Sequence, residues 1–209
     1  MNVISLNVGT TREVDNNGQP VRTGIFKIPV SGRLALKRHN FDGDQQADLS
    51  VHGGSYKAVY AYPFEHYSFW EEELGKEMPS GSFGENLTTA GLLEADVSIG
   101  DRFRIGSAEL QVTQPRLPCY KLALRFGDPE MVRRFLHSGR CGFYLAVITE
   151  GEVGTGDKIA LLHRAPDSIT ISDLFGAYTD KRPDPAVIRR ASQLVDLPQD
   201  WRTHFGERL

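Results

Sequence analysis

Short strand-like runs separated by glycine turns are the feature that most limits how this chain can fold. The runs are rich in valine, isoleucine, leucine, tyrosine or phenylalanine and lie at 3–9, 24–30, 32–40, 58–63, 101–106, 108–114 and 143–149. The chain has 21 glycines in 209 residues, and many stand where tight turns between strands need them. This alternation is typical of a β-rich domain.

Two stretches, VSIGDRFRIG (97–106) and VGTGDKIALL (153–162), share a Gly-Asp turn that leads into an apolar strand. Such turns are expected at strand junctions of a closed or nearly closed sheet. We therefore predict a mostly β, α+β fold with a barrel-like sheet.

Helices are expected in two groups. Residues 63–75, 119–126 and 129–137 predict three short helices within the β-rich part, with Asp128 as N-cap and Pro129 at the first position of the last one. Beyond residue 166 the pattern changes to three helices, at 168–180, 184–196 and 197–209. We predict a β domain at 1–165 and a helical extension at 166–209. Short helices bury little alone, so the extension should dock on the main domain or on a second subunit, which makes a homodimer one option.

Charge and cysteine content narrow the classes of partner. A formal net charge of −3 gives no reason to expect nucleic acid, and no apolar run approaches the ~20 residues needed to span a membrane. The N-terminal residues do not resemble a signal peptide, and there are two cysteines. We expect a cytoplasmic protein without a Cys119–Cys141 disulfide.

Cys119 is the first candidate for chemistry. It follows Pro118 in the segment PRLPCYKL (115–122), between Arg116 and Lys121, after one expected strand and before an expected helix. The thiol should project from the first helical turn, where the helix dipole and the two cations favour thiolate. A thiolate can attack a carbonyl, carry a persulfide or bind a soft metal; the alternative is a packed thiol. Cys141 lies in an apolar run and is interpreted as structural.

Three further segments offer polar groups. Gly53 and Gly54 allow a nest of N–H groups that suits an anionic oxygen, with His52 beside it, although a plain surface loop fits as well. Asn86 follows glycines that should bring the backbone close to an opposite segment, or it is simply a turn residue. Lys27 is a basic residue in an apolar strand and either faces solvent or serves a site.

Several known site motifs are absent from the sequence. There is no GxGxxG after a strand, no GxxxxGK[ST], no HExxH, and too few cysteines for a zinc finger or an iron–sulfur cluster. A cysteine–histidine hydrolase stays open, because residues distant in sequence can meet in space.

Taken in order, the segments DLSVHGGSYKAVYAYP (48–63), FGENLTTAGLLEADVSIGDRFRIG (83–106) and LQVTQPRLPCYKL (110–122) resemble the MOSC domain family, most closely its bacterial YiiM group. The resemblance runs from residue 23 to residue 164, and the C-terminal residues resemble that group's three-helix extension. It implies a barrel-like β fold and a molybdenum cofactor (molybdopterin) whose metal is bound by Cys119. The expected cofactor-binding residues are Lys27, His52, Gly53, Gly54, Asn86 and Arg116.

The resemblance also implies an activity, because the family includes the mitochondrial amidoxime-reducing component. The expected function is molybdenum-dependent reduction of N-hydroxylated compounds such as hydroxylaminopurines, from R–NHOH to R–NH₂. His52 would donate a proton. Electrons would come from a separate reductase, a flavoprotein or an iron–sulfur protein. The alternatives are a carrier of cofactor or persulfide without turnover, and a cysteine hydrolase.

Overall fold

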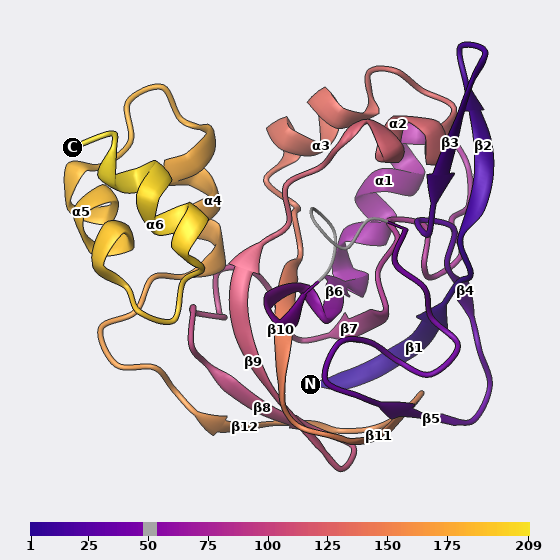
Figure 1. Cartoon of the computed structure of the whole chain (residues 1–209), viewed down its shortest axis with the longest axis horizontal. Helices are drawn as coiled ribbons and strands as arrows, with labels where there is room; N and C mark the ends of the chain where they lie inside the picture. The colour runs from indigo at the N-terminus through magenta and orange to yellow at the C-terminus, as the bar shows by residue number, and fades with distance from the viewer. Residues whose placement is uncertain (48–53) are drawn as a thin grey trace.

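An eight-stranded sheet forms the centre of the molecule in the computed structural model, which describes residues 1–47 and 54–209 (Figure 1). In spatial order its strands are β12 (Ile159–His163), β8 (Arg102–Ile105), β9 (Ala108–Pro115), β10 (Phe143–Thr149), β6 (Val59–Pro63), β7 (Leu87–Ala90), β1 (Asn2–Val8) and β4 (Ile28–Pro29). Neighbouring strands are antiparallel except β6 and β7, which are parallel. Each of the seven strand-like runs contains a strand.

The expected closed or barrel-like sheet is only partly right: the fold is a mixed α+β fold with a large sheet that stays open. Strands β12 and β4 are its two edges, and no ladder joins them in the described part of the chain. β4 has only two residues, and Pro29 has no N–H with which to extend a ladder. A single bridge between Asn2 and Lys158 brings β1 close to the start of β12 without closing the sheet.

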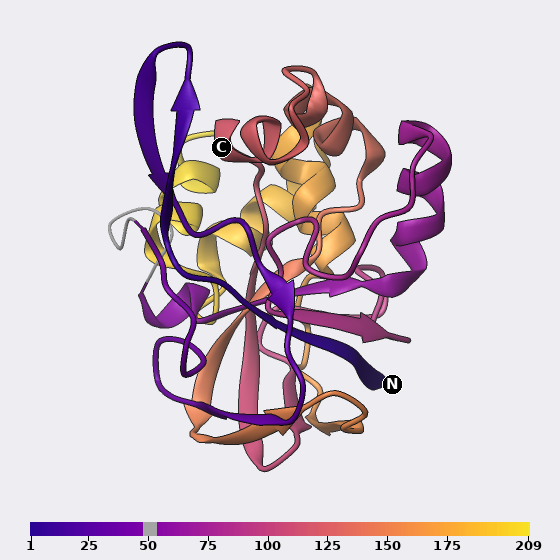
Figure 2. The same ribbon diagram turned by 90° about the vertical axis from the view of Figure 1, so that its right-hand side faces the viewer.

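Two smaller ladders complete the β structure. β5 (Arg33–Leu36) pairs with β11 (Gly151–Gly154), and β2 (Arg12–Asn16) pairs with β3 (Gln19–Thr23). The β2–β3 hairpin was not predicted. Its turn is Asn17–Gly18, with φ of 55° and 82°, which is the backbone that tight hairpin turns require. The hairpin projects from the body of the molecule (Figures 1 and 2).

Three short helices lie beyond one end of the sheet: α1 (Tyr67–Leu74), α2 (Tyr120–Phe126) and α3 (Met131–Ser138) (Figure 1). A 3₁₀ turn, Phe64–His66, precedes α1. The predicted start of α3 is two residues early, because Asp128 accepts a hydrogen bond from the Glu130 amide (2.9 Å) and shapes a turn before the helix. Trp70 of α1 and Phe135 of α3 stack with ring centres 6.0 Å apart and anchor both helices in the core.

The C-terminal segment forms the three predicted helices: α4 (Ile171–Thr179), α5 (Pro185–Gln193) and α6 (Gln199–Gly206). Asp184 caps α5 by accepting a hydrogen bond from the Ala186 amide (2.8 Å). The segment docks on the sheet domain through bonds such as the Ile171 amide to the Val97 carbonyl (2.8 Å). A boundary at residue 165 stays a prediction. Within the described ranges, no helix has the length and apolar content to cross a membrane.

Candidate functional site

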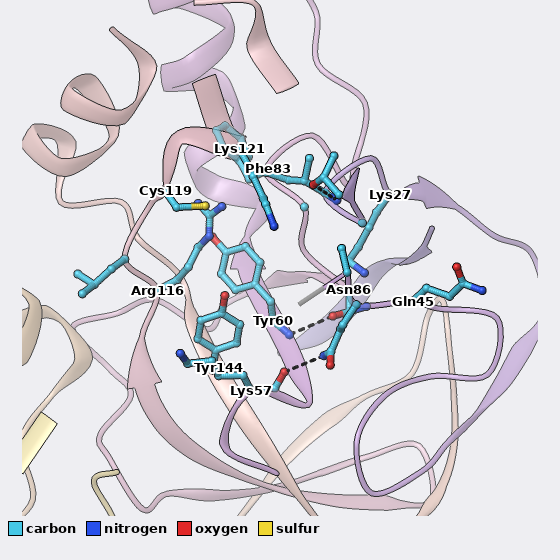
Figure 3. A pocket seen from close by; sticks show the side chains of 17 residues that line it. Lys27, Gln45, Lys57, Tyr60, Phe83, Asn86, Arg116, Cys119, Lys121 and Tyr144 are labelled. Carbon is cyan, nitrogen blue, oxygen red and sulfur yellow. Dashed lines mark hydrogen bonds between the residues drawn. The ribbon is translucent and has the colours of Figure 1, made fainter. Parts of the chain in front are cut away.

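A pocket opens between the root of the β2–β3 hairpin and the N-terminal end of α2 (Figure 3). Its walls come from residues 23–27, 45–47, 83–86 and 116–121, with side chains from β6 and β10 at the back. The cavity volume is about 90 Å³, which is room for a few water molecules. A larger ligand would therefore fill the open mouth as well as the interior.

Cys119 lines this pocket and is half-buried at the N-cap of α2. Its backbone is extended (φ −121°, ψ 173°), and the helix begins at the next residue. Its sulfur lies beside the guanidinium of Arg116 (Figure 3). Cys141 is fully buried, and burial raises the pKa of its thiol well above the usual value. The two cysteines form no disulfide, as expected.

Arg116 carries a buried charge at the back of the pocket. Its side chain is 5% exposed, and its guanidinium carbon lies 5.0 Å from the ring centre of Tyr60 and 5.1 Å from that of Phe135. Burial alone would lower the pKa of Arg116, but Tyr60, Tyr144 and Cys119 raise it. Its Nη1 atom is buried without a hydrogen-bond partner among the described residues. Such a group is stabilised by an anionic or polar ligand.

Two tyrosines that sequence reasoning missed complete the back wall. Tyr60 of β6 and Tyr144 of β10 are side by side, with ring centres 5.3 Å apart, and the Tyr60 hydroxyl donates to the Cys141 carbonyl (2.9 Å). Burial raises the pKa of both phenols, and the nearby charge of Arg116 opposes that rise. Both side chains therefore stay neutral and offer hydroxyl groups. The sequence contained a signal for them, because both tyrosines lie in predicted strands, at 58–63 and 143–149.

Lys121 is the second cation without an anionic partner. It is 8% exposed, and its ammonium makes no ion pair or hydrogen bond within the described part of the chain. Figure 3 shows its side chain reaching from α2 toward the pocket interior. The sequence had suggested only that Lys121 favours thiolate at Cys119.

Lys27 is buried, so the solvent-facing alternative is wrong. Its Nζ donates to both carboxylate oxygens of Asp44, at 2.5 and 2.6 Å. Burial lowers the pKa of Lys27, and the attraction of Asp44 opposes this. The pocket therefore includes a buried ion pair, in which the charge of Lys27 is already matched.

Asn86 lines the pocket but uses its side chain to hold the wall together. Its Nδ2 donates to Asp44 (2.9 Å) and to the Asn7 carbonyl (3.4 Å), and its Oδ1 accepts from the Tyr60 amide (3.2 Å). Both amide hydrogens are therefore committed to the protein. Asn86 positions Asp44 and β6, and it offers a ligand little beyond one lone pair of Oδ1.

The predicted glycine nest is only partly within the described structure. His52 and Gly53 lie outside the described residues. Gly54 is exposed, has φ 88° and precedes the 3₁₀ turn Ser55–Lys57. Gly54 is not among the described residues that line the pocket, whereas Lys57 from the same turn is.

The charged residues among the described pocket lining are all positive. Lys27, Lys57, Arg116 and Lys121 line the pocket, and none of the described lining residues is aspartate, glutamate or histidine. No group of three or more histidine, cysteine or acidic residues that could hold a metal occurs in the described ranges. The described lining therefore suits an anionic ligand, and among the described residues Cys119 has no cluster of further metal donors.

Comparisons with known proteins identify related sequences. The family model of the MOSC domain matches residues 48–160. YflK of Bacillus subtilis is 45% identical over 97% of this chain and 92% of its own length. YiiM of Escherichia coli is 39% identical over 92% of this chain and 86% of its own length. A protein named reductase from Gibberella moniliformis is 35% identical over 70% of this chain but only 27% of its own length.

Solved structures give the same relationship. The crystal structure of YiiM from Geobacillus stearothermophilus has a TM-score of 0.84 at 33% identity and covers all of this chain and 98% of its own. That of Escherichia coli YiiM has a TM-score of 0.79 at 29% identity and covers all of this chain and 92% of its own. The chain belongs to the MOSC domain family and is a relative of the YiiM proteins.

Proposed function

We propose that this protein is a molybdenum-cofactor-dependent reductase of N-hydroxylated compounds. The observation that carries the proposal is a half-buried thiol, Cys119, in a pocket whose described lining holds cations and no carboxylate. The reductase name of the fungal relative supports a redox role. The comparisons show that the chain belongs to the MOSC domain family; the reductase activity, the substrate class and the metal are all part of the proposal.

The described residues fit the cofactor with which MOSC domains are associated. A soft thiolate from Cys119 is a suitable molybdenum ligand. The buried Nη1 of Arg116 and the ammonium of Lys121 have no anionic partners in the described structure and would hold anionic parts of the group. When bound, the cofactor would supply two-electron chemistry.

The overall reaction is R–NHOH + 2e⁻ + 2H⁺ → R–NH₂ + H₂O, so the protein has to deliver two protons. Lys27 is a proposed source, since its ammonium lines the pocket and burial lowers its pKa. The neutral hydroxyl of Tyr144 would orient the substrate or pass a proton along, whereas the Tyr60 hydroxyl already donates to the Cys141 carbonyl. His52, expected from the sequence as a proton donor, stays a proposal outside the described residues.

Electrons are proposed to come from a separate flavoprotein or iron–sulfur protein. The sequence has no dinucleotide fingerprint and two cysteines, too few to ligate an iron–sulfur cluster. In this proposal the present chain binds and orients the substrate, and a partner protein supplies the electrons.

Cys119→Ser tests the proposal, with Cys141→Ser as the matched control for losing a thiol elsewhere. Protein purified from a host that makes the cofactor should contain molybdenum and pterin in near-stoichiometric amounts. It should reduce 6-hydroxylaminopurine with an artificial electron donor. Cys119→Ser should lose the metal and roughly 100-fold or more of the rate, because losing a direct ligand should cost at least as much as losing an outer-shell partner. Cys141→Ser should keep both, provided circular dichroism shows that it is folded.

Two outcomes contradict the reductase. Equal activity in wild type and Cys119→Ser would remove the thiol from the reaction. Full metal loading without turnover of any N-hydroxylated base would favour the carrier alternative. A cysteine hydrolase would need a histidine base near Cys119; the described pocket lining contains none, and His52 lies outside the described residues, so this alternative stays a prediction.

A further inference from the structure

Glu94 is a buried carboxylate that the proposed reaction does not use. It lies in the turn after β7, and its side chain is 6% exposed. Its Oε2 accepts a hydrogen bond from His66 Nε2 (2.8 Å), and its Oε1 accepts one from the Gly142 amide (2.7 Å). Within the described part of the chain it pairs with no lysine or arginine. Both of its oxygens are therefore committed to a histidine and to a backbone turn.

His66 holds this carboxylate in place. It ends the 3₁₀ turn Phe64–His66, and its ring centre lies 5.5 Å from that of Tyr62 in an edge-to-face arrangement. Because a carboxylate only accepts hydrogen bonds, His66 Nε2 is the donor. The ring, packed on Tyr62, thus directs the second oxygen of Glu94 at the Gly142 amide.

Gly142 leaves its turn no room to move toward β6. The residue is buried and has φ 61°, a backbone conformation that favours glycine. A Cβ there would lie 2.5 Å from the Ala61 carbonyl oxygen and 2.8 Å from Cε2 of Tyr60. The turn is therefore in tight contact with β6, and the hydrogen bond to Glu94 fixes its amide.

The same turn supports two residues of the back wall of the pocket. The Gly142 carbonyl accepts a hydrogen bond from the Arg116 amide (3.3 Å). The Cys141 carbonyl accepts one from the Tyr60 hydroxyl (2.9 Å). The guanidinium of Arg116 lies beside the Cys119 sulfur (Figure 3). A shift of the turn would therefore move Arg116 and Tyr60 relative to this thiol.

Electrostatic effects on Cys141 agree with this arrangement. Burial raises the pKa of the Cys141 thiol most, the charge of Glu94 raises it further, and the charge of Arg116 lowers it. Coulomb interactions weaken with distance, so both charges lie near this turn. Glu94 and Arg116 form no ion pair with each other in the described structure, and the turn is what connects them.

We infer that Glu94, oriented by His66, is a positioning residue for the Cys119 pocket. It holds the Cys141–Gly142 turn, and this turn fixes the Arg116 backbone and the Tyr60 hydroxyl. The guanidinium of Arg116 is thereby kept beside the Cys119 sulfur. Glu94 is not among the described residues that line the pocket, so it acts through the turn. The inference rests on the pocket being the ligand site of the proposed function, but it does not depend on the redox chemistry.

The reactivity of Cys119 reports where the guanidinium lies. The full chain, purified from a host that does not make the cofactor, is treated with the anionic disulfide dithiobisnitrobenzoate and, separately, with neutral iodoacetamide. A cation beside the sulfur speeds the first reaction more than the second, and the ratio of the two rates cancels any change in the amount of thiolate. Peptide mass spectrometry confirms that the label is on Cys119, since Cys141 is fully buried.

Four variants test the positioning role. Glu94→Ala removes both acceptors and should lower the rate ratio about threefold or more, the order expected when one unit charge moves away by several ångströms. Glu94→Gln keeps an oxygen for the Gly142 amide and should keep most of the ratio. His66→Ala removes the orienting donor and should give an intermediate ratio. Arg116→Gln gives the ratio without the guanidinium and sets the lower limit.

Asp101→Ala is the matched control for losing a buried carboxylate that holds backbone amides. Asp101 is fully buried and accepts hydrogen bonds from the Ser98 and Ala165 amides, both at 2.9 Å. It is not among the described residues that line the pocket. Its loss should lower the free energy of unfolding, measured with urea, and leave the rate ratio as in wild type. A role of Glu94 in stability alone would give this same result for Glu94→Ala.

An unchanged ratio in Glu94→Ala, or an equal fall in Asp101→Ala, would overturn the positioning role. So would a fall in Glu94→Gln as large as that in Glu94→Ala, because the bond to the Gly142 amide would then not matter. If Glu94→Ala does not fold, His66→Ala decides: a lowered ratio supports the role and an unchanged one overturns it. If the ratios change as expected but the loaded wild type reduces no N-hydroxylated compound, only the reductase is overturned.

Discussion

At the scale of single residues, the pocket depends on side chains whose surroundings decide their role. Asn86 was expected to bind the cofactor, which stays a prediction; its amide hydrogens bond to Asp44 and to the Asn7 carbonyl. Lys27 was expected to bind the cofactor, with the solvent face as the alternative, and it is buried against Asp44. In both cases the residue type was found from the sequence, whereas its partner lies on a segment that no local pattern could identify.

Gly84 is the residue at which the pocket wall is most sensitive to size. Its φ is 80°, and a Cβ there would lie 2.8 Å from Cγ1 of Ile25 on the opposite wall. The sequence had predicted that glycines in this segment bring the backbone close to another segment, and this is confirmed. A methyl group would meet both backbone strain and a steric contact.

Gly84→Ala should therefore destabilise the protein by about 2–4 kcal/mol and distort the pocket, because the strain of a left-handed residue and an overpacked contact add. Gly127→Ala is the matched control: its φ is 65°, but a Cβ there meets nothing within 4 Å, so strain alone should cost about 1 kcal/mol. Urea unfolding measures both. Equal losses of unfolding free energy in the two variants would show that the contact with Ile25 does not destabilise Gly84→Ala.

At the scale of elements, the sequence predicted the strands and helices whose local residue pattern agrees with their position in the fold. Apolar and aromatic runs bounded by turn residues predicted β1, β6, β9 and β10, and the Asp-Pro start predicted α5. β7 (Leu87–Ala90) was missed because its sequence, LTTA, has little strand signal, and it is placed by parallel pairing with β6. The β2–β3 hairpin had a usable signal in Asn17–Gly18, but its flanking residues are mostly exposed and polar.

The open sheet has a similar explanation. The Gly-Asp turns at 100–101 and 156–157 are real strand junctions, as expected. Whether a sheet closes, however, depends on the length and pairing of its edge strands. Here the edge strand β4 has only two residues and contains Pro29, which limits further pairing. No turn motif in the sequence predicts the length of an edge strand.

The turn before β12 is fixed by one ion pair between distant elements. Arg33 of β5 donates to both oxygens of Asp157, at 2.7 and 2.9 Å, and the Gly154 amide donates to the same carboxylate (2.9 Å). Burial alone would raise the pKa of Asp157, but these donors hold it below its usual value. A depressed carboxyl pKa stabilises the fold above the unfolded-state pKa, and this contribution is lost as pH falls through the folded-state value.

Asp157→Asn should lower the melting temperature most near neutral pH, and the difference from wild type should shrink below about pH 4. Glu207→Gln, at an exposed C-terminal carboxylate that makes no ion pair in the described chain, is the control and should cause little change at any pH. Melting curves between pH 3 and pH 7, as set by the usual carboxyl range, measure the effect. A constant difference across that range would mean that Asp157 is not linked to the acid transition.

At the scale of the whole molecule, the C-terminal helices and the sheet share one apolar core. Ile171, Leu174 and Phe175 of α4 are buried, and β-bridge contacts join Ser98 to Thr170. Outside this core, Gln111 of β9 donates to Asp196 (2.9 Å). The composition change near residue 165 marks a change of architecture, but the contacts across it are those of a packed interior.

A chain ending at residue 165 should therefore fail to unfold cooperatively and should bind a hydrophobic dye, because it exposes apolar surface that α4 covers. Removal of Leu209 alone, a residue that is 67% exposed, is the control and should leave the melting temperature unchanged. Calorimetry of both chains checks this. A sharp transition in the 1–165 chain would instead support an independent domain.

The pairing of the first strand has a consequence for how the protein is made. β1 pairs with β7 on one side. On the other side its end pairs with β4, and its start bonds to residues 156–159, including the Val3 amide to the Asp157 carbonyl (2.9 Å) and the Ile159 amide to the Met1 carbonyl (3.0 Å). During synthesis, the residues of β1 emerge before these partners, which lie more than 150 positions later in the chain. Assembly of this sheet is thus a late step of biosynthesis, slowed by the search for distant contacts.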